Sequence, residues 1–218
     1  IKLINTIAEL VNNDSDVNET IKVVFVHNYN VSPAEHIIPA ADVSEQISMA
    51  GKEASGTSNM KFMMNGALTM GTLDGANVEI LDAVGDENAY IFGATEDELP
   101  ALKRDYDPRW HMDNVPGLRR VLDALVDGTL DDNGSGWFYD LHRSLEPSYE
   151  PADVYYVLGD FAAYREAKDR MAHDHDADPL GWNRKVWVNI TRSGRFSSDR
   201  TISDYAREVW KIDPEPIA

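Results

Sequence analysis

The chain has 218 residues, of which 43% are hydrophobic and 27% are charged, so it contains enough apolar material for a substantial core. Lys and Arg number 20 against 38 Asp and Glu, and the net charge of −18 argues against nucleic acid or an anionic membrane as a partner. The absence of cysteine excludes disulfides, and no apolar run is long enough to span a bilayer. We therefore expect a globular cytoplasmic protein.

The predicted elements of the first hundred residues alternate between helix and strand. In chain order we expect a helix at residues 1–11, a buried strand at 21–26, short helices at 34–38 and 43–49, a helix that contains Lys61, a strand at 68–72, a helix at 78–84 and a strand at 90–92. Two strands joined through a helix run parallel in most folds. The pattern therefore predicts an α/β fold with a parallel sheet.

Helices dominate the second half of the chain. We expect them at residues 96–105, 115–126, 139–145, 154–172, 182–190 and 203–211. The acidic tract at residues 173–178 has its acids at the first, third and fifth positions of a calcium loop, but Pro179 and Lys185 replace the glycine and the glutamate that such a loop requires. We therefore expect this tract to be a solvated polar linker.

Lys61 follows a small polar turn, Glu-Ala-Ser-Gly-Thr-Ser-Asn at residues 53–59, and the apolar run Phe-Met-Met comes directly after it. Thr57, Ser58 or Asn59 can cap a helix there, which leaves backbone N–H groups available to an anion such as a phosphate. An amine packed among Met and Phe is expected to lose part of its preference for the protonated form and to become a Schiff-base nucleophile. Pyridoxal phosphate needs both features. Taken alone, a solvated helix lysine is the commoner explanation of such a turn.

Longer stretches around this turn match one enzyme family. They are Asn28-Tyr29 and residues 38–42, 44–48, 53–61, 65–69, 71–79, 155–158, 193–202 and 205–208. Together they resemble the glycogen, starch and maltodextrin phosphorylases, over nearly the whole chain.

The resemblance implies a Rossmann-like parallel sheet with flanking helices, in the second domain of a two-domain glycosyltransferase of the GT-B type. Because the chain opens at Ile1 without a methionine, we expect residues 1–218 to be an incomplete C-terminal Rossmann-like domain with a helix-rich C-terminal half. The first domain and the start of the second would then lie outside the sequence. The full protein is expected to be a homodimer.

The resemblance also assigns a cofactor site. Lys61 matches the family lysine that holds pyridoxal 5'-phosphate as an imine. Thr57 and Ser58 match positions whose backbone N–H groups bind the cofactor's phosphate, while Gln46 and Tyr29 match residues that line the site. Many family members have Gly at the position of Ser58, so a requirement for positive φ there would make Ser58 costly.

The substrate residues follow in the same way. Glu53 matches a carboxylate that hydrogen-bonds sugar hydroxyls, and Ser55 and Gly56 match positions whose backbone meets the same glucosyl unit. The implied reaction transfers the non-reducing-end glucosyl unit of an α-1,4-glucan to inorganic phosphate with retention, giving glucose 1-phosphate. The cofactor's own phosphate would act there as the partner of the substrate phosphate.

Positive charge is scarce near the predicted site. No arginine precedes Arg104, and the lysines of that stretch are Lys2, Lys22, Lys52, Lys61 and Lys103. Two phosphates held side by side need several cations, so either distant parts of the chain or further polypeptide must supply them. The alternative is that the chain alone is a non-catalytic cofactor-binding module. An aminotransferase-like use of the imine is disfavoured, since no clear Asp or Arg partner pattern accompanies Lys61.

Overall fold

The computed structural model describes residues 1–149, 151–213 and 215. The chain divides into two compact units. The first unit comprises Ile1–Ala34 and Glu98–Ala163, and the second comprises Glu35–Asp97 and Tyr164–Ala218. Each unit is therefore assembled from two stretches that lie far apart in the sequence.

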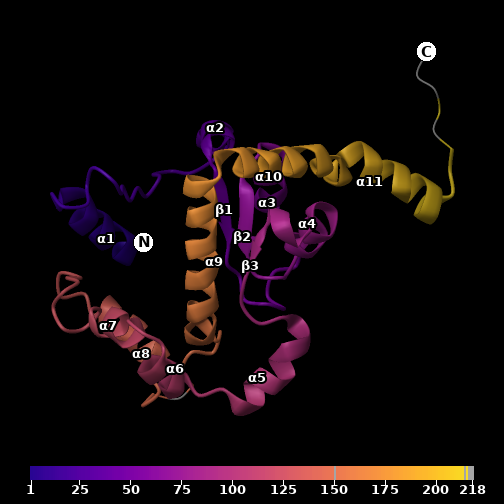
Figure 1. Ribbon diagram of the computed structural model, residues 1–218. Helices are drawn as coiled ribbons and strands as arrows, with labels where there is room; N and C mark the ends of the chain where they lie inside the picture. Colours follow the sequence, from indigo (N-terminus) through magenta and orange to yellow (C-terminus); the bar gives the residue numbers. More distant parts are fainter. Residues whose placement is uncertain (150, 214, 216–218) are drawn as a thin grey trace. The chain divides into compact units, whose positions relative to one another are not determined.

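The second unit is built on a parallel sheet of three strands, β1 (Val43–Gln46), β2 (Leu68–Gly71) and β3 (Tyr90–Ile91), which lie side by side in that order (Figure 1). Helix α3 (Ser58–Met64) connects β1 to β2, and α4 (Ala76–Val84) connects β2 to β3. All four residues of the central strand are buried. The predicted α/β fold with a parallel sheet is confirmed.

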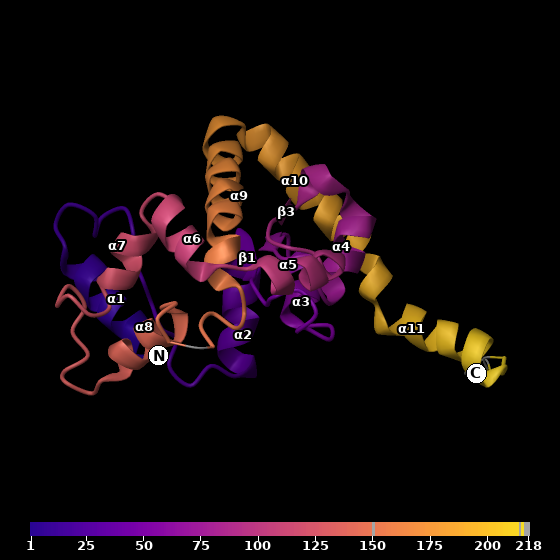
Figure 2. The same cartoon turned by 90° about the horizontal axis from the view of Figure 1, so that it is seen from below.

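The core of the second unit lies between α3, α4 and α10 (Pro179–Arg192). Met63 on α3 and Ile80 on α4 are completely buried in one cluster, and Val188 packs against it from α10. Figure 2 shows α10 running beside α4. Gly66, just after α3, allows α10 to approach closely, because a Cβ at this position would be 2.9 Å from a methyl group of Val186. Large apolar residues at helical spacing thus fix α3 and α10 against each other.

The predicted polar linker at residues 173–178 is wrong. Residues 173–177 form the last turn and a half of α9 (Val157–Ala177), and Asp178 caps α10 by accepting a hydrogen bond from the Gly181 N–H at 2.9 Å. Asp174 accepts a hydrogen bond of 2.8 Å from the Tyr90 hydroxyl. The tract is therefore helical and not a linker: Asp178 caps α10, half-buried Asp174 contacts Tyr90, and Asp176 is exposed to solvent as expected.

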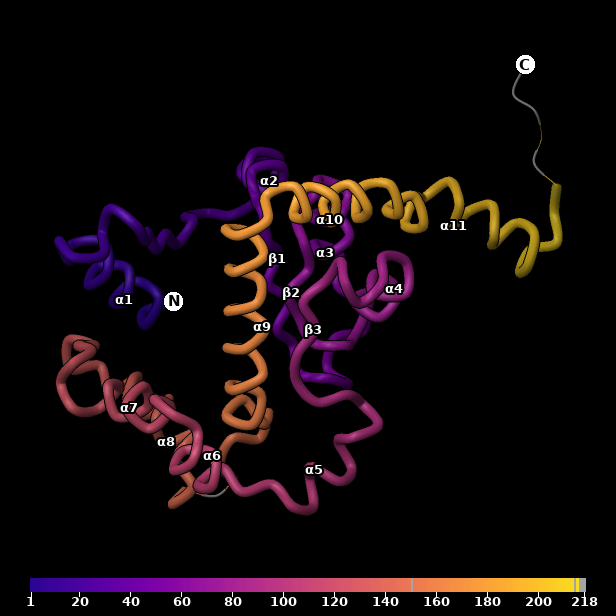
Figure 3. The backbone as a smooth tube through the Cα atoms, in the orientation of Figure 1, coloured from indigo at the N-terminus to yellow at the C-terminus, as the bar shows by residue number. Residues whose placement is uncertain are grey.

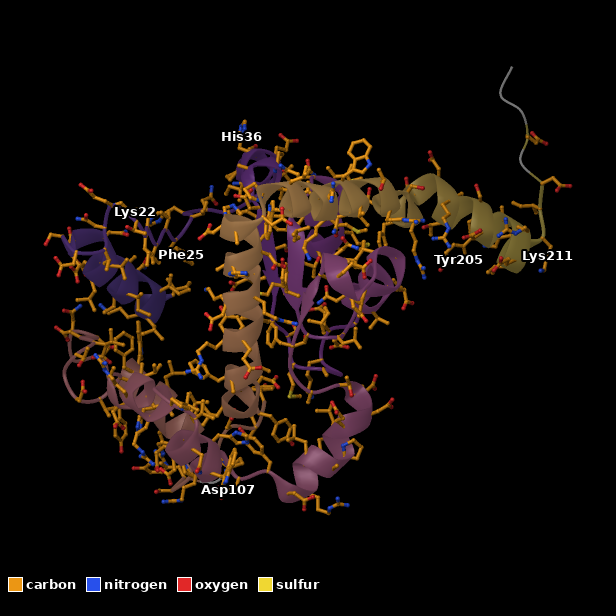
Figure 4. All side chains as sticks on the ribbon, viewed as in Figure 1. Lys22, Phe25, His36, Asp107, Tyr205 and Lys211 are labelled. Atoms are coloured by element: carbon orange, nitrogen blue, oxygen red, sulfur yellow. The ribbon has the colours of Figure 1, made fainter. Side chains whose placement is uncertain are left out.

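Two short elements end the described part of the chain. Helix α11 (Ser198–Asp204) is capped by Ser197, whose hydroxyl accepts from the Arg200 N–H at 3.3 Å. A π-helical turn, η5 (Tyr205–Trp210), continues the helix. Figure 4 labels Tyr205 at the start of this turn and Lys211 just after its end. The helix predicted at residues 203–211 is thus confirmed, although it starts earlier and changes its winding.

The described residues of the first unit are helical wherever they are regular. Its helices are α1 (Lys2–Asn13), the start of α2 (Val31–Ile37), α5 (Leu99–Asp105), α6 (Pro108–Asn114), α7 (Leu118–Asp123), α8 (Trp137–Leu145) and the start of α9. Its core consists of Met112, Val115, Leu118, Leu122 and Leu158. Helix α6 was not predicted, although Asp107 and Pro108 mark its start: the Asp107 carboxylate, labelled in Figure 4, accepts from the Arg109 N–H at 2.9 Å.

The strand predicted at residues 21–26 is wrong. This segment follows an irregular path between α1 and α2 (Figure 3), and Val24 is 74% exposed. A strand needs a neighbour to pair with, and the described residues of the first unit contain none. At Val23 the Asn12 side chain makes the bonds that a neighbouring strand would make. Its oxygen accepts from the Val23 N–H at 2.9 Å, and its NH2 group donates to the Val23 carbonyl at 2.8 Å. Lys22 and Phe25 of this segment are labelled in Figure 4.

The short helix predicted at residues 43–49 is also wrong, because Val43–Gln46 is strand β1. Its residues pair in parallel with β2, Val43 opposite Leu68 and Gln46 opposite Gly71, and the Leu68 N–H donates to the Asp42 carbonyl at 3.0 Å. Pairing with a buried neighbour outweighs the weak helical preference of this segment. Among the residues that the structure describes, no helix is both long and apolar enough to cross a membrane.

Candidate functional site

The predicted site residues of the second unit gather at the carboxyl ends of β1 and β2. Gln46 and Gly71 end these strands and lie opposite each other in the sheet. The chain leaves β1 through residues 47–57, which we call the site loop, and enters α3. It leaves β2 through residues 72–75, the β2–α4 loop. Ligands of open parallel sheets bind outside the carboxyl ends of the strands, so the two loops lie where a ligand is expected.

Glu53 is held in the site loop by contacts to both its backbone and its side chain. The N–H groups of Glu53 and Lys52 donate to one carboxylate oxygen of Asp74, at 2.7 and 3.0 Å. The Ser48 hydroxyl donates to the Glu53 carboxylate at 3.2 Å. Burial by itself would raise the pKa of Asp74, but the hydrogen bonds that its carboxylate accepts from backbone N–H groups lower the pKa below its usual value. An ionised Asp74 thus fixes the position of Glu53.

Ser55 and Gly56 are fixed through the Ser55 carbonyl. This oxygen accepts from the Ala76 N–H at 2.7 Å and from the Asn59 side-chain amide at 3.3 Å. Gly75 has a φ of 53°, and a Cβ there would lie only 2.6 Å from the Ser55 carbonyl oxygen. Gly56 has a φ of 77°, which a residue with a side chain rarely adopts. The backbone of the predicted glucosyl contact is therefore set by two glycines.

Gln46 and Ser58, predicted from separate segments to serve one cofactor, are in contact. The Gln46 amide donates to the Ser58 hydroxyl at 3.3 Å and to the Ser44 hydroxyl at 2.8 Å. Thr57 precedes α3 as its N-cap residue, without a hydrogen bond from its own side chain to the helix. Ser58 is the first residue of α3 and does not have a positive φ, so the predicted cost of Ser at this position does not arise.

Lys61 lies on α3, three residues after Ser58, and its side chain is exposed. The predicted packing of this amine among Met and Phe is wrong. Met63 is buried completely in the core of the second unit, and residues two apart on a helix point to nearly opposite sides. The amine is therefore accessible to a reagent, and the neighbouring Met and Phe residues do not shield it.

Tyr29 belongs to the first unit and is 55% exposed, while the other candidate residues belong to the second unit. Its role in lining a cofactor site stays a prediction.

Three polar residues hold the two loops together. They are Asp74 and Asn77, to which the sequence analysis gave no role, and Asn59, which it considered only as a helix cap; both asparagines are buried. The Asn59 amide donates to the Asn77 side-chain oxygen at 3.1 Å, and the Asn77 amide donates to the Thr72 carbonyl at 3.0 Å. The sequence held a signal for this role of Asp74 and Asn77, because Asp and Asn around a glycine are typical of turns in which side chains form hydrogen bonds with the backbone.

Comparison with known proteins assigns the chain to a family. A family model for carbohydrate phosphorylases matches residues 1–212. The chain belongs to the carbohydrate phosphorylase family. It is 46% identical over 213 residues to the glycogen phosphorylase of Chlamydia pneumoniae, 45% identical over 218 residues to the liver form of human glycogen phosphorylase, and 45% identical over 218 residues to the glycogen phosphorylase of Synechocystis sp..

These alignments include 97 to 100% of this chain but 25% of each relative. The chain thus spans about a quarter of the length of the curated relatives that it matches.

Proposed function

We propose that this chain carries the cofactor lysine of an α-1,4-glucan phosphorylase. The enzyme would transfer the non-reducing-end glucosyl unit of glycogen, starch or maltodextrin to inorganic phosphate and release glucose 1-phosphate. The observation that supports this most is the convergence of Gln46, Glu53 and Ser58 at the carboxyl ends of β1 and β2, directly before the helix of Lys61. The relatives named above, which are glycogen phosphorylases, support it as well.

The residues present have the chemistry to hold pyridoxal 5'-phosphate. Lys61 offers an exposed primary amine to the aldehyde. Gln46 and Ser58 place an amide and a hydroxyl at the start of α3, where the first backbone N–H groups lack acceptors within the helix. Thr57 and Ser58 would bind the phosphate ester through these N–H groups. When bound, the cofactor supplies a phosphate that exchanges charge or a proton with the substrate phosphate.

The site loop would hold the sugar. The Glu53 carboxylate would accept hydrogen bonds from glucosyl hydroxyls, and the backbone of Ser55 and Gly56 would contact the same ring. The Ser48 hydroxyl, 3.2 Å from the Glu53 carboxylate, already orients that group before substrate arrives. Contacts held in place beforehand stabilise an oxocarbenium-like glucosyl group without reorganisation during the reaction.

The isolated chain is proposed to be inactive, because the sequence around Lys61 supplies too few cations for a phosphate clamp. Between residues 35 and 97 the lysines are Lys52 and Lys61, and there is no arginine. Two phosphates in contact repel strongly in a site from which water is excluded. We propose that the rest of the phosphorylase polypeptide supplies the missing cations and covers the exposed Lys61. Residues 1–218 would then be part of the second Rossmann-like domain of a homodimeric enzyme.

A second candidate function is that of a cofactor-binding module without catalysis. The exposure of Lys61 and the shortage of cations around it favour this alternative for the chain on its own.

Attachment of the cofactor is tested by chemical labelling. The purified chain is incubated with pyridoxal phosphate, reduced with borohydride and digested for peptide mass mapping. We expect the label on Lys61 and its loss in Lys61→Arg. Lys52→Arg is the matched control, since Lys52 is also exposed and lies in the site loop, and this variant should label normally. A label on another lysine with Lys61 unmodified would rule out the assignment.

Catalysis is tested by adding maltodextrin and inorganic phosphate to the isolated chain. We expect no glucose 1-phosphate, because the cations that offset two phosphates are missing near Lys61. Robust release by the chain alone would show that it contains a complete phosphate clamp.

A further inference from the structure

The segment of the site loop from Lys52 to Ser55 is fastened to the β2–α4 loop and the start of α4 at both of its ends. At one end Asp74 accepts the N–H groups of Lys52 and Glu53. At the other end the Ala76 N–H donates to the Ser55 carbonyl. Glu53 and Ser55, two of the residues that would contact the sugar, are themselves held by these contacts. The shape of the site loop is therefore dictated by a neighbouring loop that does not itself carry a predicted substrate contact.

The Asp74 end is the more polar of the two. Its carboxylate contacts backbone N–H groups, and hydrogen bonds from neutral donors to a charged acceptor are roughly twice as strong as those between neutral groups. The two distances, 2.7 and 3.0 Å, converge on one oxygen atom, so Glu53 and Lys52 cannot shift independently. Because Glu53 is one of the two donors, any displacement of this contact moves the Glu53 carboxylate.

The other end is held by buried amides. Asn59 is 1% exposed and bonds the Ser55 carbonyl and the Asn77 side chain, and Asn77 in turn bonds the Thr72 carbonyl. A close contact also joins the Thr72 hydroxyl to the Ser48 carbonyl. This chain of hydrogen bonds ties the site loop to the end of β2, which is the central strand of the sheet. The sheet thus provides a rigid base for the loop.

We propose that Asp74 is a positioning residue for sugar binding, which holds the Glu53 backbone so that the Glu53 carboxylate is set for the glucosyl unit. Asn77, acting through Asn59, holds the Ser55 backbone in the same way. This inference rests on the proposed role of Glu53, Ser55 and Gly56 in contacting the sugar. Asp74 acts through the backbone of Lys52 and Glu53 and makes no contact with Lys61, so its loss weakens sugar binding and leaves attachment of the cofactor at Lys61 intact.

The variant that tests this is Asp74→Asn, with Asp82→Asn as the matched control. Asp74→Asn keeps the size of the side chain but removes the charge that attracts the two N–H groups. Asp82 lies on α4 in the same unit and is exposed, so the control loses the same charge without loss of a loop contact.

Hydrogen exchange in the chain shows first whether the contact forms. We expect the amides of Lys52 and Glu53 to exchange about tenfold faster or more in Asp74→Asn, the effect of losing a hydrogen bond to a charged group. Asp82→Asn should leave them unchanged. Unchanged exchange in Asp74→Asn would overturn the proposal at this step.

Kinetics of the whole phosphorylase that contains this chain then separates positioning from general stability. In Asp74→Asn we expect the KM for maltodextrin to rise about tenfold, with a smaller change in kcat and a normal yield of borohydride-reduced label at Lys61. An unchanged KM, or a loss of label in parallel with activity, would overturn the proposal, since the latter indicates a merely structural role. If the unmodified enzyme releases no glucose 1-phosphate, the proposed function itself fails, and the positioning role fails with it.

Discussion

At the scale of single residues, the predicted sugar site depends on positions that have no side chain at all. Gly75 combines a φ of 53° with a backbone neighbour, the Ser55 carbonyl oxygen, at the place where a Cβ would stand. The crowding atom belongs to the main chain of the site loop and cannot rotate away as a flexible side chain would. A methyl group at this position must therefore push the site loop off the start of α4.

We expect Gly75→Ala to lower the free energy of unfolding by about 2 kcal/mol or more, of which about 1 kcal/mol comes from the positive φ. Gly128→Ala is the matched control, because Gly128 also has a positive φ, 92°, but no atom lies within 4 Å of its virtual Cβ. Urea unfolding curves measure both variants. Equal losses in the two would contradict the crowding by Ser55.

The sequence predicted the proximity of Gln46 and Ser58 better than it predicted the surroundings of Lys61. Gln46 and Ser58 were assigned to one site from matching motifs, and they are in contact. The exposure of Lys61 was not predicted, because Met63 points toward the core on the other side of α3 and Met64 is itself exposed. Burial depends on what packs against a helix face, and that information lies in distant segments.

At the scale of elements, one cluster of polar side chains joins β3, α9 and α10. Asp174 on α9 accepts from the Tyr90 hydroxyl and lies 3.4 Å from the Lys185 amine. Partial burial alone would raise the pKa of Asp174, but the Tyr90 hydrogen bond and the charge of Lys185 lower it below the ordinary value of 3.8. Burial, together with the same hydrogen bond, raises the pKa of Tyr90. The cluster is thus stable with Asp174 ionised and Tyr90 protonated.

This cluster makes stability depend on pH in the acidic range. A carboxylate with a lowered pKa in the folded state contributes its full stability above the ordinary value of 3.8 and loses it as the pH falls through the folded value. Between about pH 5 and about pH 2 the wild type should lose more unfolding free energy than Asp174→Asn. Solvent screening limits the difference to about 1 kcal/mol. Asp176→Asn, at an exposed position on the same helix, should follow the wild type, and thermal unfolding at each pH measures all three.

The elements that the sequence predicted well have a strong pattern of their own. Helices α1, α4 and α8 and strand β2 appear where apolar spacing placed them. Residues 43–46, predicted as helix, form a strand because they find β2 to pair with. Residues 21–26, predicted as a strand, are irregular because the described residues of their unit contain no strand. Strand formation depends on a partner, so a local pattern cannot decide it. The prediction for the acidic tract at residues 173–178 was wrong for a related reason. The partners of Asp174, Tyr90 and Lys185, come from other elements.

At the scale of the whole molecule, the chain contains two separate cores. Leu122 belongs to the core of the first unit, and Ile80 belongs to that of the second. The core of the second unit joins two stretches of sequence, whereas the core of the first unit lies within Glu98–Ala163. In the first unit the Thr6 hydroxyl of α1 donates to the Asp131 carbonyl at 3.3 Å across its two stretches. Stability should therefore be local to each unit.

We expect Leu122→Ala and Ile80→Ala each to cost about 2–5 kcal/mol, the usual effect of emptying a buried aliphatic site. Hydrogen exchange followed by mass spectrometry should show faster exchange in the first unit alone for Leu122→Ala and in the second unit alone for Ile80→Ala. Each variant serves as the control for the other. Acceleration spread equally over both units by either variant would show that the two cores unfold together.

The late position of α10 in the sequence has a consequence for biosynthesis. Val188 and Phe196, which complete the cluster around Met63 and Ile80, leave the ribosome only after more than a hundred further residues have followed the sheet strands β1 and β2. During that interval the nascent polypeptide exposes an incomplete apolar surface to solvent, the state in which chaperones bind and aggregation begins. Translation pauses before residue 179 should therefore be harmful to the yield of native protein, whereas pauses after residue 196 should be tolerated.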